Sequence, residues 1–88
     1  MKINCIKSGG FLGLQRSCEI ETNDLDESEK KAFEKVKKES RRDENVRDTF
    51  IYYFKFQENN LEKEIVVEET CLEEEMMPFI RKVDHKLN

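Results

Sequence analysis

An aromatic segment near the middle of the chain constrains the fold more than any other part of the sequence. From Thr49 to Gln57 every second residue is aromatic, namely Phe50, Tyr52, Phe54 and Phe56. This alternation is typical of a β-strand that buries one face against a core. A chain that contains such a strand needs a sheet around it and a layer that covers the aromatic face.

The residues after this strand indicate a tight hairpin. Asn59 and Asn60 tolerate the positive φ angles of a two-residue turn, so Glu58 should pair with Leu61. In that register, apolar side chains face apolar ones and charges face opposite charges. The predicted pairs are Phe54–Ile65, Tyr52–Val67, Tyr53–Val66 and Lys55–Glu64. We expect the first two pairs, together with Phe56, to face the helices.

Two shorter strand signals lie near the N-terminus, on either side of a glycine-rich segment. Lys2 to Lys7 suits a strand, and Leu14 to Thr22 alternates between apolar and polar residues. All three glycines of the protein lie between these segments, in the sequence Ser8-Gly9-Gly10-Phe11-Leu12-Gly13, which we call the glycine loop. Glycine permits positive φ angles, so we expect the two strands to form a hairpin across this loop.

Two helices are predicted from capping signals and apolar periodicity. Asp26 and Glu29 are spaced as a capping box, and a helix with one narrow apolar face should run from there to about Ser40. We expect residues 41–48 to form a polar connection. A second capping box is indicated from Thr70 to Glu73, before an amphipathic C-terminal segment. Pro78 would cost about 3 kcal/mol or more inside a helix, so we expect a short turn over 70–76 and a main helix that begins near residue 77 or 78.

These elements follow the order ββαββα and predict an α+β fold. We expect a four-stranded, mostly antiparallel sheet with two helices packed on one face, the aromatic one. The 88 residues are 36% hydrophobic and 41% charged, which suffices for one small core. We therefore expect a single domain over residues 1–88, and a large enzyme with deep cavities is excluded.

Charge and hydropathy exclude several classes of partner. The net charge is −4, whereas nucleic-acid modules bind phosphate through clustered Lys and Arg. We therefore expect no nucleic-acid partner, and anionic membranes are disfavoured for the same reason. No segment approaches the ~20 apolar residues of a transmembrane helix, and the N-terminus lacks the apolar run of a signal peptide. These features predict a cytoplasmic protein with no membrane partner.

The residue types that carry chemistry are sparse. Cys5, Cys18 and Cys71 are an odd number without a Cys-x-x-Cys spacing, so we interpret them as unpaired and reduced. His85 is the only histidine, and we expect it on the exposed side of the C-terminal helix. No nucleophile motif such as Gly-x-Ser-x-Gly is present. We therefore expect no catalytic residues, no cofactor, no metal site and no enzymatic activity.

The glycine loop is the strongest candidate for a functional site. It matches neither glycine-rich phosphate-binding pattern, but it carries two large apolar residues in succession, Phe11 and Leu12. Either one of them packs against the edge of the sheet, or the loop displays them to a partner, and the residues alone leave both readings open. The candidate partner-binding residues are Ser8, Gly9, Gly10, Phe11, Leu12, Gly13 and Leu14.

The N-terminal sequence also carries a resemblance. Met1-Lys2-Ile3-Asn4, then Lys7-Ser8-Gly9-Gly10-Phe11-Leu12-Gly13-Leu14 and Cys18-Glu19-Ile20-Glu21-Thr22, resembles the emfourin family, whose characterised members inhibit thermolysin-like zinc metallopeptidases. The later aromatic strand, hairpin and closing helix with Pro78 fit the same pattern. The resemblance implies inhibition of such a peptidase. Thermolysin-like enzymes prefer a bulky apolar residue just after the scissile bond, which Phe11 would supply.

Two functions from different classes follow. The first is an inhibitor that occludes the active-site cleft of a thermolysin-like metallopeptidase with the glycine loop. The second is an interaction or regulatory module that binds through the sheet edge or the C-terminal helix and has no peptidase target. For either function we expect a monomer.

Overall fold

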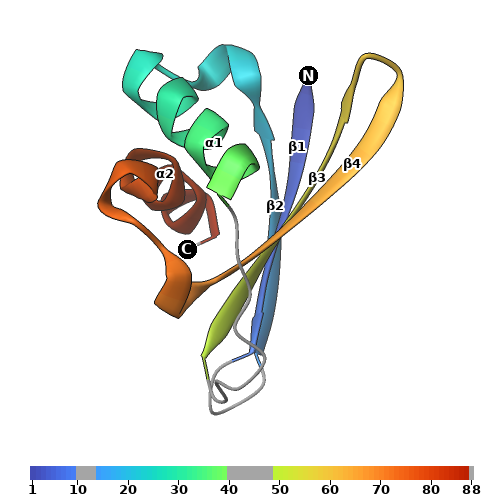
Figure 1. The fold of residues 1–88 in the computed structure, drawn as a ribbon. Coiled ribbons are helices and arrows are strands. Elements are labelled where there is room, and N and C mark those ends of the chain that lie inside the picture. Colours follow the sequence, from blue (N-terminus) through green and yellow to red (C-terminus); the bar gives the residue numbers. More distant parts are fainter. Residues whose placement is uncertain (10–13, 40–48, 88) are drawn as a thin grey trace.

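The computed structural model describes residues 1–9, 14–39 and 49–87. Its main elements run in the order ββαββα, as the sequence predicts (Figure 1). The strands are β1 (Lys2–Gly9), β2 (Leu14–Glu21), β3 (Phe50–Glu58) and β4 (Leu61–Glu68), and the helices are α1 (Glu27–Glu39) and α2 (Met77–Leu87). The polar connection expected at 41–48 lies outside the described residues.

The four strands form one antiparallel sheet in the order β2-β1-β3-β4. The β3–β4 hairpin has the predicted register, since Phe54 pairs with Ile65 and Glu58 pairs with Leu61. Asn59 and Asn60 form its turn with φ angles of 56° and 64°, which is the conformation that the two asparagines predict. The β1–β2 hairpin across the glycine loop is also confirmed. β1 lies between β2 and β3, so the sheet joins the two hairpins at its centre.

Helix α1 begins at the predicted capping box. The backbone N–H of Asp26 donates to Oε1 of Glu29 at 2.9 Å, and the N–H of Glu29 donates to Oδ1 of Asp26 at 2.8 Å. These reciprocal bonds satisfy two N–H groups that the first turn of a helix leaves without a partner. The helix buries one narrow face, as its thin apolar stripe predicts, through Ala32, Phe33 and Val36.

Helix α2 begins at Met77, so Pro78 lies in its first turn, where a missing N–H breaks no helical hydrogen bond. Two short 3-10 helices precede it, Glu69–Cys71 and Glu74–Met76, in place of the predicted turn over 70–76. The prediction of a second capping box at Thr70 is wrong. Thr70 lies inside the first 3-10 helix and caps nothing, because an α-helix that began there would carry Pro78 in its interior.

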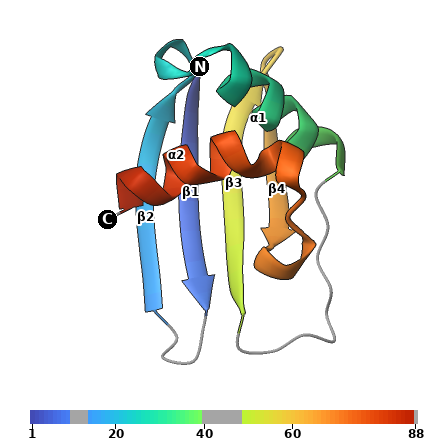
Figure 2. The same ribbon diagram turned by 90° about the vertical axis from the view of Figure 1, so that its left-hand side faces the viewer.

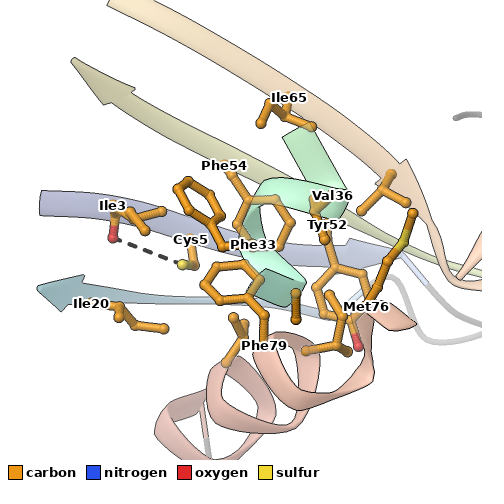
Figure 3. Packing of buried hydrophobic residues seen from close by; sticks show 14 of the residues in the cluster. Ile3, Cys5, Ile20, Phe33, Val36, Tyr52, Phe54, Ile65, Met76 and Phe79 are labelled. Atoms are coloured by element: carbon orange, nitrogen blue, oxygen red, sulfur yellow. Dashed lines mark hydrogen bonds between the residues drawn. The ribbon is translucent and has the colours of Figure 1, made fainter. Parts of the chain in front are cut away.

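Both helices cover the same face of the sheet (Figures 1 and 2). The core between the two helices and the sheet is rich in aromatic residues (Figure 3). The ring of Phe79 in α2 lies 4.8 Å from that of Phe33 in α1 and 5.3 Å from that of Phe54 in β3, measured between centroids. Tyr52, Phe54, Phe56, Ile65 and Val67 are all buried, which confirms the predicted inward face of the second hairpin.

The three cysteines are unpaired, as predicted. Cys5 is buried in the core and lies opposite Cys18 in the β1–β2 register. Burial, with a smaller contribution from Cys18, raises the pKa of the Cys5 thiol far above its usual value. Cys5 therefore stays a neutral thiol at physiological pH. His85 is exposed on α2, also as predicted.

Candidate functional site

The structure places the two ends of the glycine loop but not its middle. Ser8 and Gly9 are the last residues of β1, and Leu14 is the first residue of β2. The other four candidate residues, Gly10, Phe11, Leu12 and Gly13, lie outside the described residues. β1 is two residues longer than the predicted strand, because Ser8 and Gly9 pair with β2 on one side and with β3 on the other.

Gly9 occupies a position that requires glycine. Its backbone φ angle is +106°, which residues other than glycine rarely adopt. A Cβ placed there would lie 2.5 Å from the carbonyl oxygen of Thr49. Gly9 also pairs with Leu14 and with Phe50. The first glycine of the loop therefore lets the base of the hairpin lie directly against the start of β3.

A charged cluster ties this base to the C-terminal helix. Lys7 lies on the helix-facing side of β1, and its Nζ is 3.2 Å from Oδ1 of Asp84 in α2. The hydroxyl of Tyr52 donates to the same oxygen at 3.0 Å. The ammonium group of Lys7 also lies 4.6 Å from the ring centroid of Phe50 and 5.0 Å from that of Tyr52. One cation thus joins β1, β3 and α2 two residues before Gly9.

The cluster keeps its charge pattern at physiological pH. Partial burial by itself lowers the pKa of Lys7, but the hydrogen bonds with Tyr52 and Asp84 outweigh it, so the pKa is raised. Burial, the largest cause, raises the pKa of Tyr52 to about 12, although the neighbouring Lys7 acts in the opposite direction. Lys7 therefore stays charged and Tyr52 stays a hydrogen-bond donor.

A second contact holds the end of α2 near the hairpin. Nη1 of Arg16, in β2, donates to the carbonyl oxygen of Leu87 at 3.4 Å. Arg16 is the register partner of Lys7, so both strands of the hairpin contact the last turns of α2. Below this crossing β1 and β2 extend past α2 toward the loop (Figure 2).

Sequence reasoning did not find the pair formed by Lys7 and Asp84. The two residues are 77 positions apart, and no local pattern relates them. The sequence did hold one signal. Lys7 is two residues after Cys5 and four after Ile3, so it points to the same, buried side of β1 as they do. A lysine on the inward side of a strand needs an anion within reach, since an unpaired charge there is costly.

The model of the emfourin family matches residues 6–84, which include the second half of β1, the whole glycine loop, β2, α1, the β3–β4 hairpin and most of α2. The chain belongs to the emfourin family. The resemblance seen at the N-terminus thus extends over nearly the whole chain. No curated protein and no solved structure matches the chain.

Emfourins are known as inhibitors of metallopeptidases and not as enzymes, so a metallopeptidase is the general class of partner for this emfourin. In the part of the chain that the structure describes, no group of three His, Cys, Asp or Glu side chains is placed to hold a metal ion. None of the described helices is long and apolar enough to cross a membrane. The feature that stands out in the described residues is the β1–β2 hairpin at one end of the sheet. The base of its glycine loop is constrained at Gly9.

Proposed function

We propose that this emfourin inhibits a thermolysin-like zinc metallopeptidase by placing the glycine loop, Ser8–Gly13, in the active-site cleft. The observation that carries the proposal is the constrained base of the loop at Gly9. A loop that blocks a cleft must enter it at little cost in conformational entropy, and a base held in one conformation lowers that cost. Gly9, Lys7 and their partners supply such a base.

The chemistry of the loop supports a binding role without catalysis. Glycines at positions 9, 10 and 13 let the backbone approach a cleft wall closely, because they carry no side chain. Phe11 is the residue that we assign to the pocket for the side chain after the scissile bond, with Leu12 and Leu14 as its neighbours. Binding hot spots are enriched in large side chains, aromatic ones among them, that fill well-packed pockets of the partner.

The alternative function, an interaction module with no peptidase target, gains no support from the family match, since that match is to a family of peptidase inhibitors. The genes beside the one that encodes this chain offer an independent indication. A neighbouring gene for a thermolysin-like peptidase would name the first enzyme to test.

The test is a titration of the purified protein against thermolysin-like peptidases, with and without a small hydroxamate that binds the catalytic zinc. Occlusion of the cleft predicts that the two inhibitors compete, so the apparent inhibition constant of the protein rises linearly with the hydroxamate concentration. Inhibition that hydroxamate leaves unchanged would place the protein outside the cleft. A complete lack of inhibition across the panel would remove the proposed function.

A further inference from the structure

The strand β3 departs from the alternation that a sheet with one covered face requires. In its second half the outward residues are polar, Lys55 and Gln57. In its first half the outward residues are Ile51 and Tyr53, so this half is apolar on both faces. A strand with one solvated face normally alternates apolar with polar residues, so two apolar residues on the outward side need an explanation.

The sheet gathers further apolar side chains around these two. Tyr53 pairs with Ile6 of β1 on one side and with Val66 of β4 on the other. These residues and Ile51 form what we call the outer patch: Ile6, Ile51, Tyr53 and Val66. All four are partly exposed, and both helices lie on the opposite face of the sheet (Figures 1 and 2).

The surroundings of the outer patch differ from the rest of the same face. Toward the glycine loop its neighbours on β1 and β2 are uncharged, since Ser8 pairs with Ile51 and with Gln15. On β4, Ile51 pairs with Glu68, which is buried. A shallow hollow of about 290 Å³ lies on this face and is lined by Ile6, Ser8, Gln15, Tyr53, Lys55 and Glu64. Away from the loop, the outward positions next to the patch are mainly charged or polar, and include Glu19, Asn4, Lys55 and Glu64.

We propose that the outer patch is a second contact surface for the metallopeptidase, which packs an apolar projection of the rim of its cleft against Tyr53. This inference rests on the proposed function. Ile51 lies opposite Ser8, and Phe50 opposite Gly9, so the patch begins at the base of the glycine loop. Gly9 lies three positions after Ile6 in β1, a distance of about 10 Å. A partner that encloses the loop therefore reaches the patch with no charged side chain of β1 or β3 on the outward face between them.

The size of the patch argues against a second copy of this chain as the occupant. A stable interface takes ~20–30 residues from each partner, and four partly exposed side chains are too few to form one alone. If the glycine loop binds a partner, the same four side chains extend that interface. They then add the apolar contact area that a short loop lacks. Contiguous apolar surface on an uncovered face commonly marks such a contact.

The experiment compares two substitutions on the outward side of β3. Tyr53→Thr removes the central aromatic ring and keeps a residue that favours strands, and Gln57→Thr makes the same new side chain at the far end of the same face. Thermal unfolding first establishes that both variants fold. Against a peptidase that the wild type inhibits, Tyr53→Thr should raise the inhibition constant about ten- to a hundredfold, and Gln57→Thr should change it less than about twofold.

Each outcome decides a separate point. A folded Tyr53→Thr variant that inhibits like the wild type overturns the outer patch and leaves the loop proposal standing. If Tyr53→Thr does not fold, Ile51→Thr and Val66→Thr take its place with the same expectation. Dimers in sedimentation that Tyr53→Thr dissociates, with inhibition unchanged, would show a second copy as the occupant and also overturn the proposal. If the wild-type protein inhibits no metallopeptidase, the proposed function is wrong. A metallopeptidase as the partner of the outer patch is then excluded as well.

Discussion

Lys7 and Asp84 form an ion pair that joins β1, two residues before Gly9, to the C-terminal helix, with 3.2 Å between Nζ and Oδ1. Tyr52 donates its hydroxyl proton to the same carboxylate oxygen. The side chains of Lys7 and Asp84 are 22% and 38% exposed, so water screens the pair only in part. The contact therefore couples the position of α2 to the base of the glycine loop.

The substitution Asp84→Asn tests this coupling. The new amide would still accept the Tyr52 hydroxyl proton but would leave the partly buried Lys7 without its anion. We expect the free energy of unfolding to fall by up to about 1 kcal/mol, since the pair is partly exposed. Urea unfolding measures the change, and Glu62→Gln, which alters an exposed acid on β4, is the matched control with no expected effect. Equal stability of both variants would show that the ion pair contributes nothing.

Gly9→Ala should destabilise the protein by about 2–3 kcal/mol, because alanine is strained at a φ of +106° and its Cβ would meet the Thr49 carbonyl at 2.5 Å. Ser8→Ala, one residue earlier and in ordinary strand geometry, should have a small effect. Thermal unfolding of both variants provides the comparison. If Gly9→Ala unfolds at the same temperature as the wild type, the backbone at Gly9 is not constrained as described and the loop is not preorganised.

Phe54→Ala should be among the most damaging single substitutions. Its side chain is fully buried and contacts the ring of Phe79 at the centre of the core. Removal of a buried aromatic ring costs about 3–5 kcal/mol through lost transfer energy and the cavity left behind. Denaturant unfolding measures the loss, and Phe50→Ala, which removes a partly exposed ring from the same strand, should cost clearly less.

Phe11→Ala tests the assignment of the loop. If Phe11 fills a pocket of the peptidase, its removal should cost about 2–4 kcal/mol of binding and raise the inhibition constant roughly thirty- to a thousandfold, with folding nearly intact. The neutralisation of the exposed Glu74, by Glu74→Gln, should change inhibition little and mainly through salt-sensitive association rates.

The same variant also separates the two readings of the loop. A Phe11→Ala protein that unfolds would show that Phe11 packs into the core, as the alternative reading holds. A folded variant with unchanged inhibition would show that another surface, such as a sheet edge or α2, binds the peptidase.

Glu58 should contribute to the loss of stability in acid. Hydrogen bonds from Lys37 and Lys63 hold the pKa of Glu58 at about 2, below its ordinary value of 4.5. Because the folded-state pKa is lowered, the contribution of Glu58 is fully present above pH 4.5 and is lost as the pH falls toward 2. The stability difference between the wild type and Glu58→Gln should therefore shrink over that interval. A difference that stays constant from about pH 7 to about pH 2 would contradict this assignment.

Local signals in the sequence account for the individual elements of the fold. The register of β3 and β4 follows from Asn59, Asn60 and the alternation on either side, because a two-residue turn leaves one way to pair the strands. The start of α1 follows from two side chains three residues apart. Pro78 sets the start of α2, since a helix tolerates proline in its first turn. The single wrong signal, at Thr70, was a local pattern that Pro78 overrode.

The strand order was decided only by the tertiary structure. Nothing local to either segment states that β1 pairs with β3, and that pairing brings Ile6 beside Tyr53 and Gly9 beside Phe50. The contact between Lys7 and Asp84 depends on the same arrangement, over a separation of 77 residues. Turns and caps act within a few residues and can be recognised in the sequence. Contacts between distant segments depend on how whole elements pack, so the base of the glycine loop and the outer patch emerge only when the sheet is assembled.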